Sequence, residues 1–346
     1  MSFPNLRGAP PVSRVPFLTR AAHPATAAPL ALVPRGATRG LRHHAHLLSA
    51  SLLIGSACFA APPADSQTPA PEREAEFVNL NPSWSPDGET IVFESWRSRR
   101  GVLYIVNADG TGERQLTVGA GDNTHPHWSP DGSRIVYDSH RDGVWNLYTI
   151  RPDGTDERPL TRRGWDTAST FARHPAWSPD GKWIAFDSSR DGNNEIYVMS
   201  ADGGEARRIT QSPANESHPG WTPDSRVTFG MTTGDQRQTF AADPVTGLAK
   251  PLFEASTPWR TGDLSPDGRY LLFTSRDDGT LRLYVVPADG TSPPVALTPE
   301  GSTTYEWAWA PDSRRIAFYF DRDGRFDLYT VAVDGGDLRQ LTTRSR

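Results

Sequence analysis

Six residues of this 346-residue chain occupy one repeated position, and their types are suited to binding or catalysis. Each lies three residues before a tryptophan or before the residue that replaces it; in chain order they are Asn81, His125, His174, His218, Thr261 and Glu306. Adjacent imidazoles and a carboxylate can hold a divalent metal ion or recognise an acidic group. The structural alternative is that His-Pro belongs to the repeat itself and each ring only hydrogen-bonds loop backbone; the sequence leaves both open.

A second candidate surface is the loop at residues 162–173, the longest link between two repeats. It contains Trp165, Phe171 and Arg173. An enlarged loop with aromatic and Arg side chains is typical of an interaction surface. The alternative is that these aromatic side chains pack back onto the neighbouring repeat.

The elements that must position these residues form an internal repeat. A Ser-Pro-Asp-Gly turn or a close variant recurs six times, with prolines 44, 49, 44, 43 and 45 residues apart; they are Pro86, Pro130, Pro179, Pro223, Pro266 and Pro311. In this turn Pro presets φ, Asp hydrogen-bonds nearby backbone and Gly accepts a positive φ. A period in the mid-forties that holds four strands is typical of a propeller blade.

The repeat at residues 174–210 shows the expected strands most clearly. Its strands are predicted at 174–177, 183–186, 196–199 and 206–210, with turns between them. The chain is therefore predicted to be an all-β protein, a six-bladed β-propeller of four-stranded antiparallel blades. A single blade has apolar residues on both faces, so neighbouring blades must stack to bury them.

Details of the repeat lead to three narrower expectations. The tryptophans at the repeated position are predicted to wedge between adjacent blades; they are Trp84, Trp128, Trp177 and Trp221. The fourth repeat lacks the usual Asp-Gly, and its second strand is predicted to be shorter than the others. The ring closes either by packing of the first blade on the last or by pairing of residues 72–77 with the last blade, and the sequence does not decide.

Residues 1–61 are predicted to be a disordered extension followed by an export signal, with 62–75 as a linker and 76–346 as the propeller. The signal contains a basic stretch and an apolar run at 47–61, which is shorter than the ~20 residues of a membrane span. Cys58, the only cysteine, offers a second interpretation as the acylated residue of a lipoprotein. We therefore expect a periplasmic or secreted protein with no membrane span, either soluble or anchored through Cys58.

Charge and cysteine content exclude several classes of function. The chain has 36 basic and 41 acidic residues, and six of the basic ones lie in the acid-free segment 1–64. The acidic remainder argues against nucleic acid as a partner. The predicted propeller has no cysteine, which excludes disulfides, Cys-ligated metals and Cys nucleophiles there. The motifs of serine hydrolases, zinc proteases, P-loop enzymes and dinucleotide-binding enzymes are also absent, which favours a non-enzymatic role.

The repeat resembles that of the TolB family, the periplasmic propeller proteins of the Tol–Pal system. The resemblance rests on Trp-Ser-Pro-Asp-Gly, aliphatic-x-Phe, Arg-Asp-Gly, aliphatic-Tyr, Ala-Asp-Gly and a closing Leu-Thr, and it covers residues 76–342. It implies a propeller surface of the kind with which TolB binds Pal. About 75 residues precede the first blade and look like leader and linker, so the N-terminal α/β domain of TolB is predicted to be missing.

Two functions follow from these observations. The first is a binding module of the periplasm or cell envelope, without a cofactor, for an envelope protein or a small acidic or saccharide ligand. Its binding residues are predicted to be Asn81, His125, His174, His218, Glu306, Trp165, Phe171 and Arg173. The second is a metal-dependent carbohydrate-active enzyme, because oligogalacturonate lyases similarly have His ligands on the axis of a propeller; the ligands of the divalent metal are then His125, His174 and His218. In either case we expect a monomer.

Overall fold

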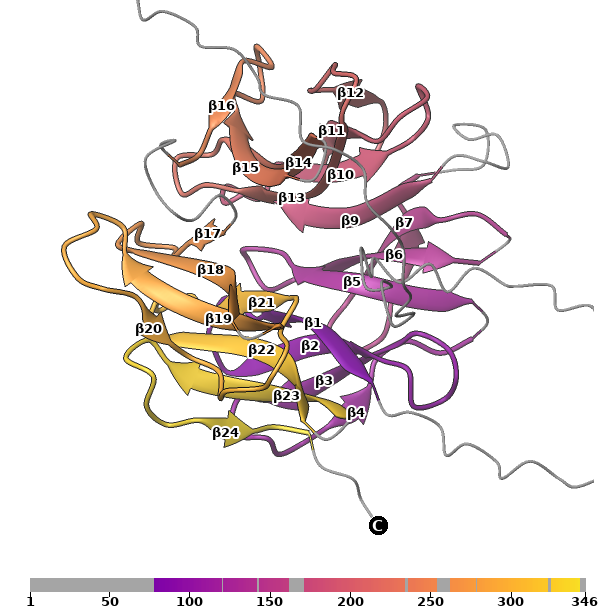
Figure 1. Cartoon of the computed structure of the whole chain (residues 1–346). Helices are drawn as coiled ribbons and strands as arrows, with labels where there is room; N and C mark the ends of the chain where they lie inside the picture. Colours follow the sequence, from indigo (N-terminus) through magenta and orange to yellow (C-terminus); the bar gives the residue numbers. More distant parts are fainter. Residues whose placement is uncertain are drawn as a thin grey trace, which may run out of the picture. The chain divides into compact units, whose positions relative to one another are not determined.

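The computed structural model describes residues 78–119, 121–141, 143–161, 171–233, 236–253, 262–277, 279–322 and 325–342. Within them, 24 strands form six antiparallel sheets of four consecutive strands, which confirms the predicted all-β, six-bladed propeller (Figure 1). No helix in these residues has the length and apolar character needed to cross a membrane. The predicted leader, linker and lipid-anchor cysteine, as well as Trp165 and Thr261, lie outside the described residues.

The first three blades have first strands of six or seven residues. Blade one consists of β1 (Asn79–Trp84), β2 (Thr90–Ser95), β3 (Val102–Asn107) and β4 (Arg114–Gln115). Blade two consists of β5 (Asp122–Trp128), β6 (Ile135–His140), β7 (Asn146–Ile150) and β8 (Arg158–Pro159). Blade three consists of β9 (Ala172–Trp177), β10 (Trp183–Ser188), β11 (Glu195–Ser200) and β12 (Ala206–Arg208).

Blade four keeps a first strand of seven residues, whereas blades five and six have first strands of two and three residues and second and third strands of eight. Blade four consists of β13 (Asn215–Trp221), β14 (Val227–Thr233), β15 (Gln236–Ala242) and β16 (Ala249–Pro251). Blade five consists of β17 (Asp263–Leu264), β18 (Tyr270–Asp277), β19 (Thr280–Pro287) and β20 (Val295–Ala296). Blade six consists of β21 (Trp307–Trp309), β22 (Arg315–Arg322), β23 (Arg325–Ala332) and β24 (Arg339–Gln340).

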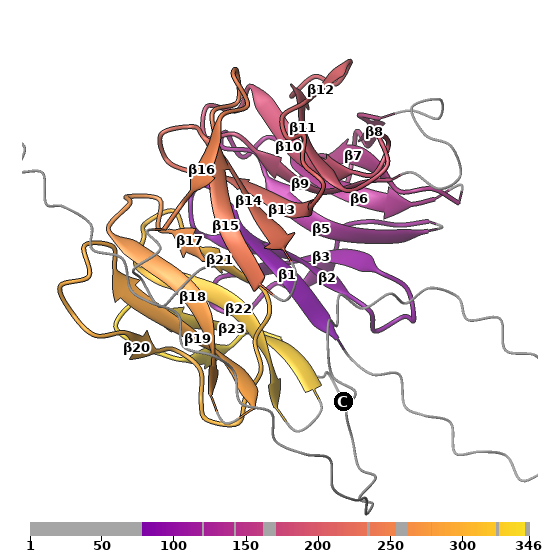
Figure 2. The same cartoon turned by 45° about the horizontal axis from the view of Figure 1, so that its top comes forward.

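The first strand of each blade lies on the inner side of the ring, as both views show (Figure 1, Figure 2). Successive first strands are neighbours, since β1 contacts β5, β5 contacts β9 and β9 contacts β13, while β1 also contacts β21. The short fourth strand of each sheet lies at the opposite, outer edge. Residues of the first strands therefore line the axis.

The repeated turn has the chemistry expected from its sequence. In blade two, Gly132 N donates to Ser129 O over 2.9 Å, and Ser129 Oγ donates to Asp131 Oδ1 over 2.6 Å. Gly132 has a φ of 71°, a value that a residue with a side chain rarely adopts. The turn thus ends one strand and begins the next at a fixed point of each blade.

The closing threonine of five repeats clamps the fourth strand to the third. In blade three, Thr210 Oγ1 accepts a hydrogen bond of 2.9 Å from Ile196 N, the position that a longer fourth strand would have occupied. Equivalent bonds are accepted by Thr117, Thr161, Thr298 and Thr342. This clamp explains why β12 ends at Arg208, two residues before the predicted end.

The tryptophans pack between blades as predicted. Trp128 lies in one cluster with Leu103 of blade one and Ile135 of blade two. Trp177 packs in the same way between blades two and three, and Trp221 between blades three and four. Each large ring therefore buries apolar surface of two sheets at once, which is what holds neighbouring blades together.

The first blade packs directly on the last. Trp84 lies in one cluster with Leu328 of blade six, and its Nε1 donates to Ala308 O over 3.2 Å. Asn79 Nδ2 donates to Thr342 Oγ1 over 3.2 Å, and Val78 forms a single parallel bridge with Phe326. In the described residues the ring thus closes by packing, by side-chain hydrogen bonds and by this bridge; residues 72–77, the alternative strand, lie outside them.

One expectation about blade four is wrong. Its second strand was predicted to be shorter, but β14 has seven residues and pairs with β15 from Val227–Ala242 to Thr233–Gln236. The sequence Val-Thr-Phe-Gly-Met interrupts the apolar pattern at Gly230, yet the backbone ladder continues through this residue. Gly230 is therefore a regular member of the strand, although it contributes no side chain.

Candidate functional site

Four residues at the repeated position share an unusual backbone conformation. Asn81, His125, His174 and His218 have φ of 50°, 49°, 51° and 53°, in the left-handed region that residues other than glycine rarely adopt. The pairing of first and second strand is interrupted at this point in each of these blades. All four residues precede a proline, whereas the equivalent residues of blades five and six do not. Such a bulge redirects a side chain, here toward the axis.

The structure brings five of the six repeated positions together, and we call them the hub cluster: Asn81, His125, His174, His218 and Glu306. The ring centroids of His125 and His174 lie 4.1 Å apart, and those of His174 and His218 lie 4.0 Å apart. His218 Nε2 lies 3.8 Å from Glu306 Oε1. The three imidazole side chains keep 20%, 15% and 33% of their surface exposed, so water reaches them.

Three buried carboxylates support the hub cluster, and the sequence analysis missed them. They follow the aromatic residue of the second strand in blades one to three and are Glu94, Asp138 and Asp187. Glu94 Oε2 accepts a hydrogen bond of 2.8 Å from Asn81 Nδ2 and one of 3.0 Å from His125 N. The sequence contains a signal for them. In three second strands that are otherwise buried, an acidic residue directly follows the aromatic residue at the same place.

The two Asp–His pairs of the hub cluster differ in protonation. Asp138 Oδ1 lies 2.9 Å from His125 Nδ1, and Asp187 Oδ1 lies 2.6 Å from His174 Nδ1. Burial opposes a charge on His125, but Asp138 raises its pKa above the usual value, and His125 and Arg173 in turn hold the pKa of Asp138 low against burial. Burial raises the pKa of Asp187 to about 7 and, with the charges of His125 and Arg173, lowers that of His174 well below its usual range. The first pair favours the ionic form and the second the neutral form.

Glu306, like the supporting Asp187, has a pKa near neutrality. Burial raises its pKa to about 7, against the attraction of His125 and Arg237. The side chain nevertheless keeps 42% of its surface exposed. A carboxylate that is surrounded by protein and still contacts water is expected in the wall of a narrow channel.

The predicted loop surface is only partly within the described residues. Arg173 Nε donates to Asp138 Oδ2 over 3.3 Å, and its guanidinium lies 4.3 Å from the centroid of the Trp145 ring. Phe171 is half-buried, and Trp165 lies outside the described residues. Arg173 is thus held against the hub cluster and adds a positive charge to it.

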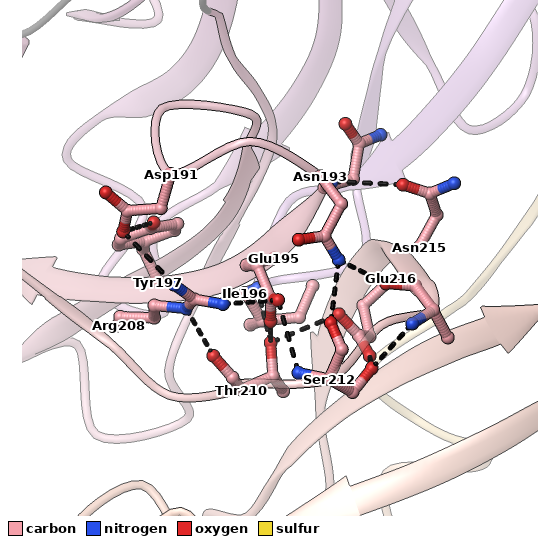
Figure 3. Close-up of polar contacts among 12 residues, drawn as sticks. Asp191, Asn193, Glu195, Ile196, Tyr197, Arg208, Thr210, Ser212, Asn215 and Glu216 are labelled. Atoms are coloured by element: carbon pink, nitrogen blue, oxygen red, sulfur yellow. Dashed lines mark hydrogen bonds and ion pairs between the residues drawn. The ribbon is translucent and has the colours of Figure 1, made fainter.

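A separate buried polar cluster joins blades three and four (Figure 3). Its centre is formed by Glu195 and Glu216, which are 0% and 1% exposed. Arg208 pairs with Glu195, Thr210 Oγ1 donates to Glu195 Oε2 over 2.6 Å, and Ser212 Oγ donates to Glu216. Burial, followed by the neighbouring Glu195, raises the pKa of Glu216 to about 7. All of these contacts are internal, so the cluster acts as a joint between two blades.

The geometry bears on the metal alternative in two ways. Among the described residues, no group of three or more His, Cys, Asp and Glu side chains is arranged to hold a metal ion. A carboxylate on Nδ1 is nevertheless the orientation that metal-binding histidines use, and His125 and His174 both have it. The positions proposed as ligands are thus oriented as such ligands would be, without forming a ligand set in this conformation.

A cleft of about 650 Å³ lies elsewhere, between blades two and three. Its lining includes Pro159, Leu160, Arg190 and residues 202–206. None of them belongs to the hub cluster or to the carboxylates that support it. We therefore place the candidate site at the axis, where titratable groups converge, and not at this cleft.

Comparison with known proteins identifies related propellers. Residues 68–174 and 166–257 match the family described as TolB beta propeller domain. Dipeptidyl aminopeptidase BIII of Pseudoxanthomonas mexicana is 31% identical over 125 residues, which cover 34% of this chain and 18% of that protein. TolB from Acinetobacter baumannii superimposes with a TM-score of 0.56 at 21% identity, over 76% of this chain and 62% of that one. An oligogalacturonate lyase from Vibrio parahaemolyticus superimposes with a TM-score of 0.52 at 15% identity, over 74% and 91% of the two chains.

These matches differ in what they establish. The chain spans less than two thirds of the peptidase and of the Acinetobacter TolB. The two structural likenesses, at 21% and 15% identity, concern the fold alone. The family match, in contrast, covers more than half of the chain.

Proposed function

This chain belongs to the TolB beta propeller family, and from that premise we propose that it is an exported binding module of the cell envelope. It engages an envelope protein or a small acidic ligand at the hub cluster. The resemblance to TolB supports the envelope location, and the absence of catalytic motifs from the sequence supports a role in binding. Glu306 and the three imidazoles supply the recognition.

The observation that carries this proposal is the column of three water-accessible imidazoles on a strained backbone. A non-glycine residue held at a left-handed φ costs on the order of 1–3 kcal/mol, and such strain is typical of functional sites. A side-chain hydrogen bond to loop backbone does not require an imidazole, because Asn also adopts this φ and offers both a donor and an acceptor. Histidine at three adjacent blades is explained by ligand recognition.

The proposal is tested by capture from the envelope extract of cells that encode the protein. We expect the tagged wild type to retain a specific partner or ligand, and the double variant His218→Ala, Glu306→Gln to lose it. Arg269→Gln is the matched control, because Arg269 is exposed and only pairs with Asp267 in a turn. Far-UV circular dichroism and the thermal midpoint establish that each variant is folded. Equal capture by the double variant contradicts the proposal.

The metal-dependent carbohydrate-active enzyme is the second candidate. It is favoured by the carboxylate-oriented His125 and His174 and by the propeller fold that this chain shares with an oligogalacturonate lyase. Elemental analysis of the purified protein tests it, with His174→Ala as the comparison. Stoichiometric metal that disappears in the variant supports this candidate, and metal-free protein that is inert on uronate oligosaccharides with added manganese excludes it.

A further inference from the structure

Blade four departs from the hub pattern at one position. In blades one to three, the second strand provides a carboxylate next to the hub residue, whereas Gly230 occupies the equivalent place in blade four. Arg237 from β15 fills this space instead. A Cβ atom at position 230 would lie 2.6 Å from Arg237 Nε and 2.8 Å from Nη2. The guanidinium therefore rests on Gly230, and a side chain at this position would have to displace it.

Beside His218, Arg237 places a hydrogen-bond donor where blades two and three place a carboxyl group. Its Nη2 lies 3.3 Å from His218 Nδ1. A guanidinium can only donate, so Nδ1 accepts and the ring proton resides on Nε2. Burial lowers the pKa of His218 well below its usual range, and the charges of His174 and Arg237 add to this effect. The neutral ring therefore directs an N–H toward Glu306, 3.8 Å away.

The result is a group of donors that a ligand can reach. Arg237 is exposed, so its remaining N–H groups are accessible, and His218 keeps 33% of its side-chain surface exposed. Blades two and three differ, because there the carboxyl groups of Asp138 and Asp187 lie against the imidazole Nδ1 in place of a guanidinium. Blade four is thus the corner of the hub best suited to receive an anion.

We propose that Arg237, His218 and Glu306 form a carboxylate-binding site at the blade-four corner of the hub, which rests on the hub cluster being the binding site of this protein. A guanidinium matches the planar carboxylate with two parallel hydrogen bonds. The His218 Nε2–H supplies a further donor, and Glu306 Oε1 lies 3.8 Å from this nitrogen. Arg237 and His218 are binding residues in this proposal, and Gly230 is a positioning residue.

The ligand is a carboxylate and not a phosphate dianion, because the site is already rich in acids. Glu306 feels the negative charges of Asp263 and Glu94 as well as the positive charges of His125 and Arg237. Two cations cannot balance a dianion in addition to these carboxylates. A single negative charge, spread over two oxygens, fits the local charge better.

The test uses acetate, a monocarboxylate, as the probe and calorimetry at pH 6, with the full chain. We expect the wild type to bind acetate, and Arg237→Gln to weaken binding by about tenfold or more, the usual effect of losing a charge-assisted hydrogen bond. Gly230→Ala should weaken it as strongly without altering any charge, because its methyl group displaces the flexible end of Arg237. Arg269→Gln is the control and should bind as the wild type does.

Several results overturn the proposal. They are a wild type that does not bind acetate at pH 6, equal binding of the uncharged acetamide, the sulfate dianion binding more tightly than acetate, or unchanged binding by Arg237→Gln. If Gly230→Ala does not fold, Arg237→Gln still decides, because it alters an exposed side chain. Loss of partner capture in the His218, Glu306 double variant together with unchanged acetate binding in Arg237→Gln rejects this inference alone. Unchanged capture in the double variant rejects the proposed function itself.

Discussion

Asp138→Asn and Asp187→Asn change the same position of two adjacent blades, and we expect different effects on stability from them. Both carboxylates are buried and both lie against the Nδ1 of a hub histidine, at 2.9 Å and 2.6 Å. They differ in their surroundings, since Arg173 also donates to Asp138. The pKa of Asp138 is therefore lowered, whereas burial raises that of Asp187 to about 7.

The expected loss in Asp138→Asn is large. Asp138 accepts from Thr124 Oγ1 over 2.8 Å and from Arg173 Nε over 3.3 Å, besides its contact with His125. Removing one charge from a buried ion pair typically destabilises a protein by about 3–5 kcal/mol. Asn keeps the shape and one acceptor, so we expect about 3 kcal/mol at pH 7. The pKa of His125 should fall at the same time, because Asp138 no longer raises it.

For Asp187→Asn the sign depends on pH. The folded wild type retains a proton on Asp187 that the unfolded chain releases near pH 3.8, so its stability falls as pH rises toward about 7. A difference between 3.8 and about 7 corresponds to at most about 4 kcal/mol. Asn cannot ionise and does not share this loss. Relative to the wild type, the variant should therefore gain stability from pH 4 to pH 7 and match or exceed it at pH 8.

Urea denaturation at pH 5, 6, 7 and 8 measures both effects, with the slope of each transition checked for constancy. The pKa of His125 is read from the proton signals of its imidazole. The reasoning is refuted if the two variants lose the same stability at every pH. It is also refuted if the pKa of His125 stays above its usual value in Asp138→Asn, because then Asp138 is not what raises it.

Three further predictions concern the blades. Trp128→Ala should lower the free energy of unfolding by about 3–5 kcal/mol, measured by urea denaturation, because it leaves a cavity between blades one and two. Glu216→Gln should stabilise the protein relative to the wild type above pH 7, where Glu216 ionises beside Glu195; hydrogen exchange of β13 at pH 6 and pH 8 checks this. Thr161→Val should cost about 1–3 kcal/mol in the same denaturation experiment, because it leaves the buried N–H of Leu147 without its 2.9 Å acceptor.

The fold could be predicted because the turn and strand pattern of one blade recurs six times in the sequence. The spacing of the turn prolines alone indicates the number of blades, and the turn chemistry at Ser129-Pro130-Asp131-Gly132 fixes where strands begin. Strand ends were less accurate, since they depend on contacts distant in sequence. Thr210 leaves its strand to accept from Ile196 N, a bond that no local pattern in the sequence indicates.

The site was only half visible in the sequence. The repeated position before each wedge tryptophan indicates which residues face the axis, and five of them do come together. The repeated position before each tryptophan indicates residues of the first strands alone. The supporting acids Asp138 and Asp187 lie on second strands and were therefore missed. The bulge that turns His125 inward also depends on pairing between strands. The pKa values of these groups are harder still to predict from the sequence, because two equivalent Asp–His pairs differ only through neighbours such as Arg173.

A ring of similar blades creates a difficulty for recognition that blade four resolves. If every blade placed the same acid beside the same imidazole, the axis would present one repeated charge pattern and could not orient an asymmetric ligand. Gly230 weakens its own strand slightly, since glycine in a strand interior is destabilising by roughly 0.5–1 kcal/mol. It also leaves room for Arg237 to reach a hub residue from the third strand, where a side chain at position 230 would displace the guanidinium. The substitution that looks like erosion of the repeat therefore provides the asymmetry that a ligand with one charged end requires.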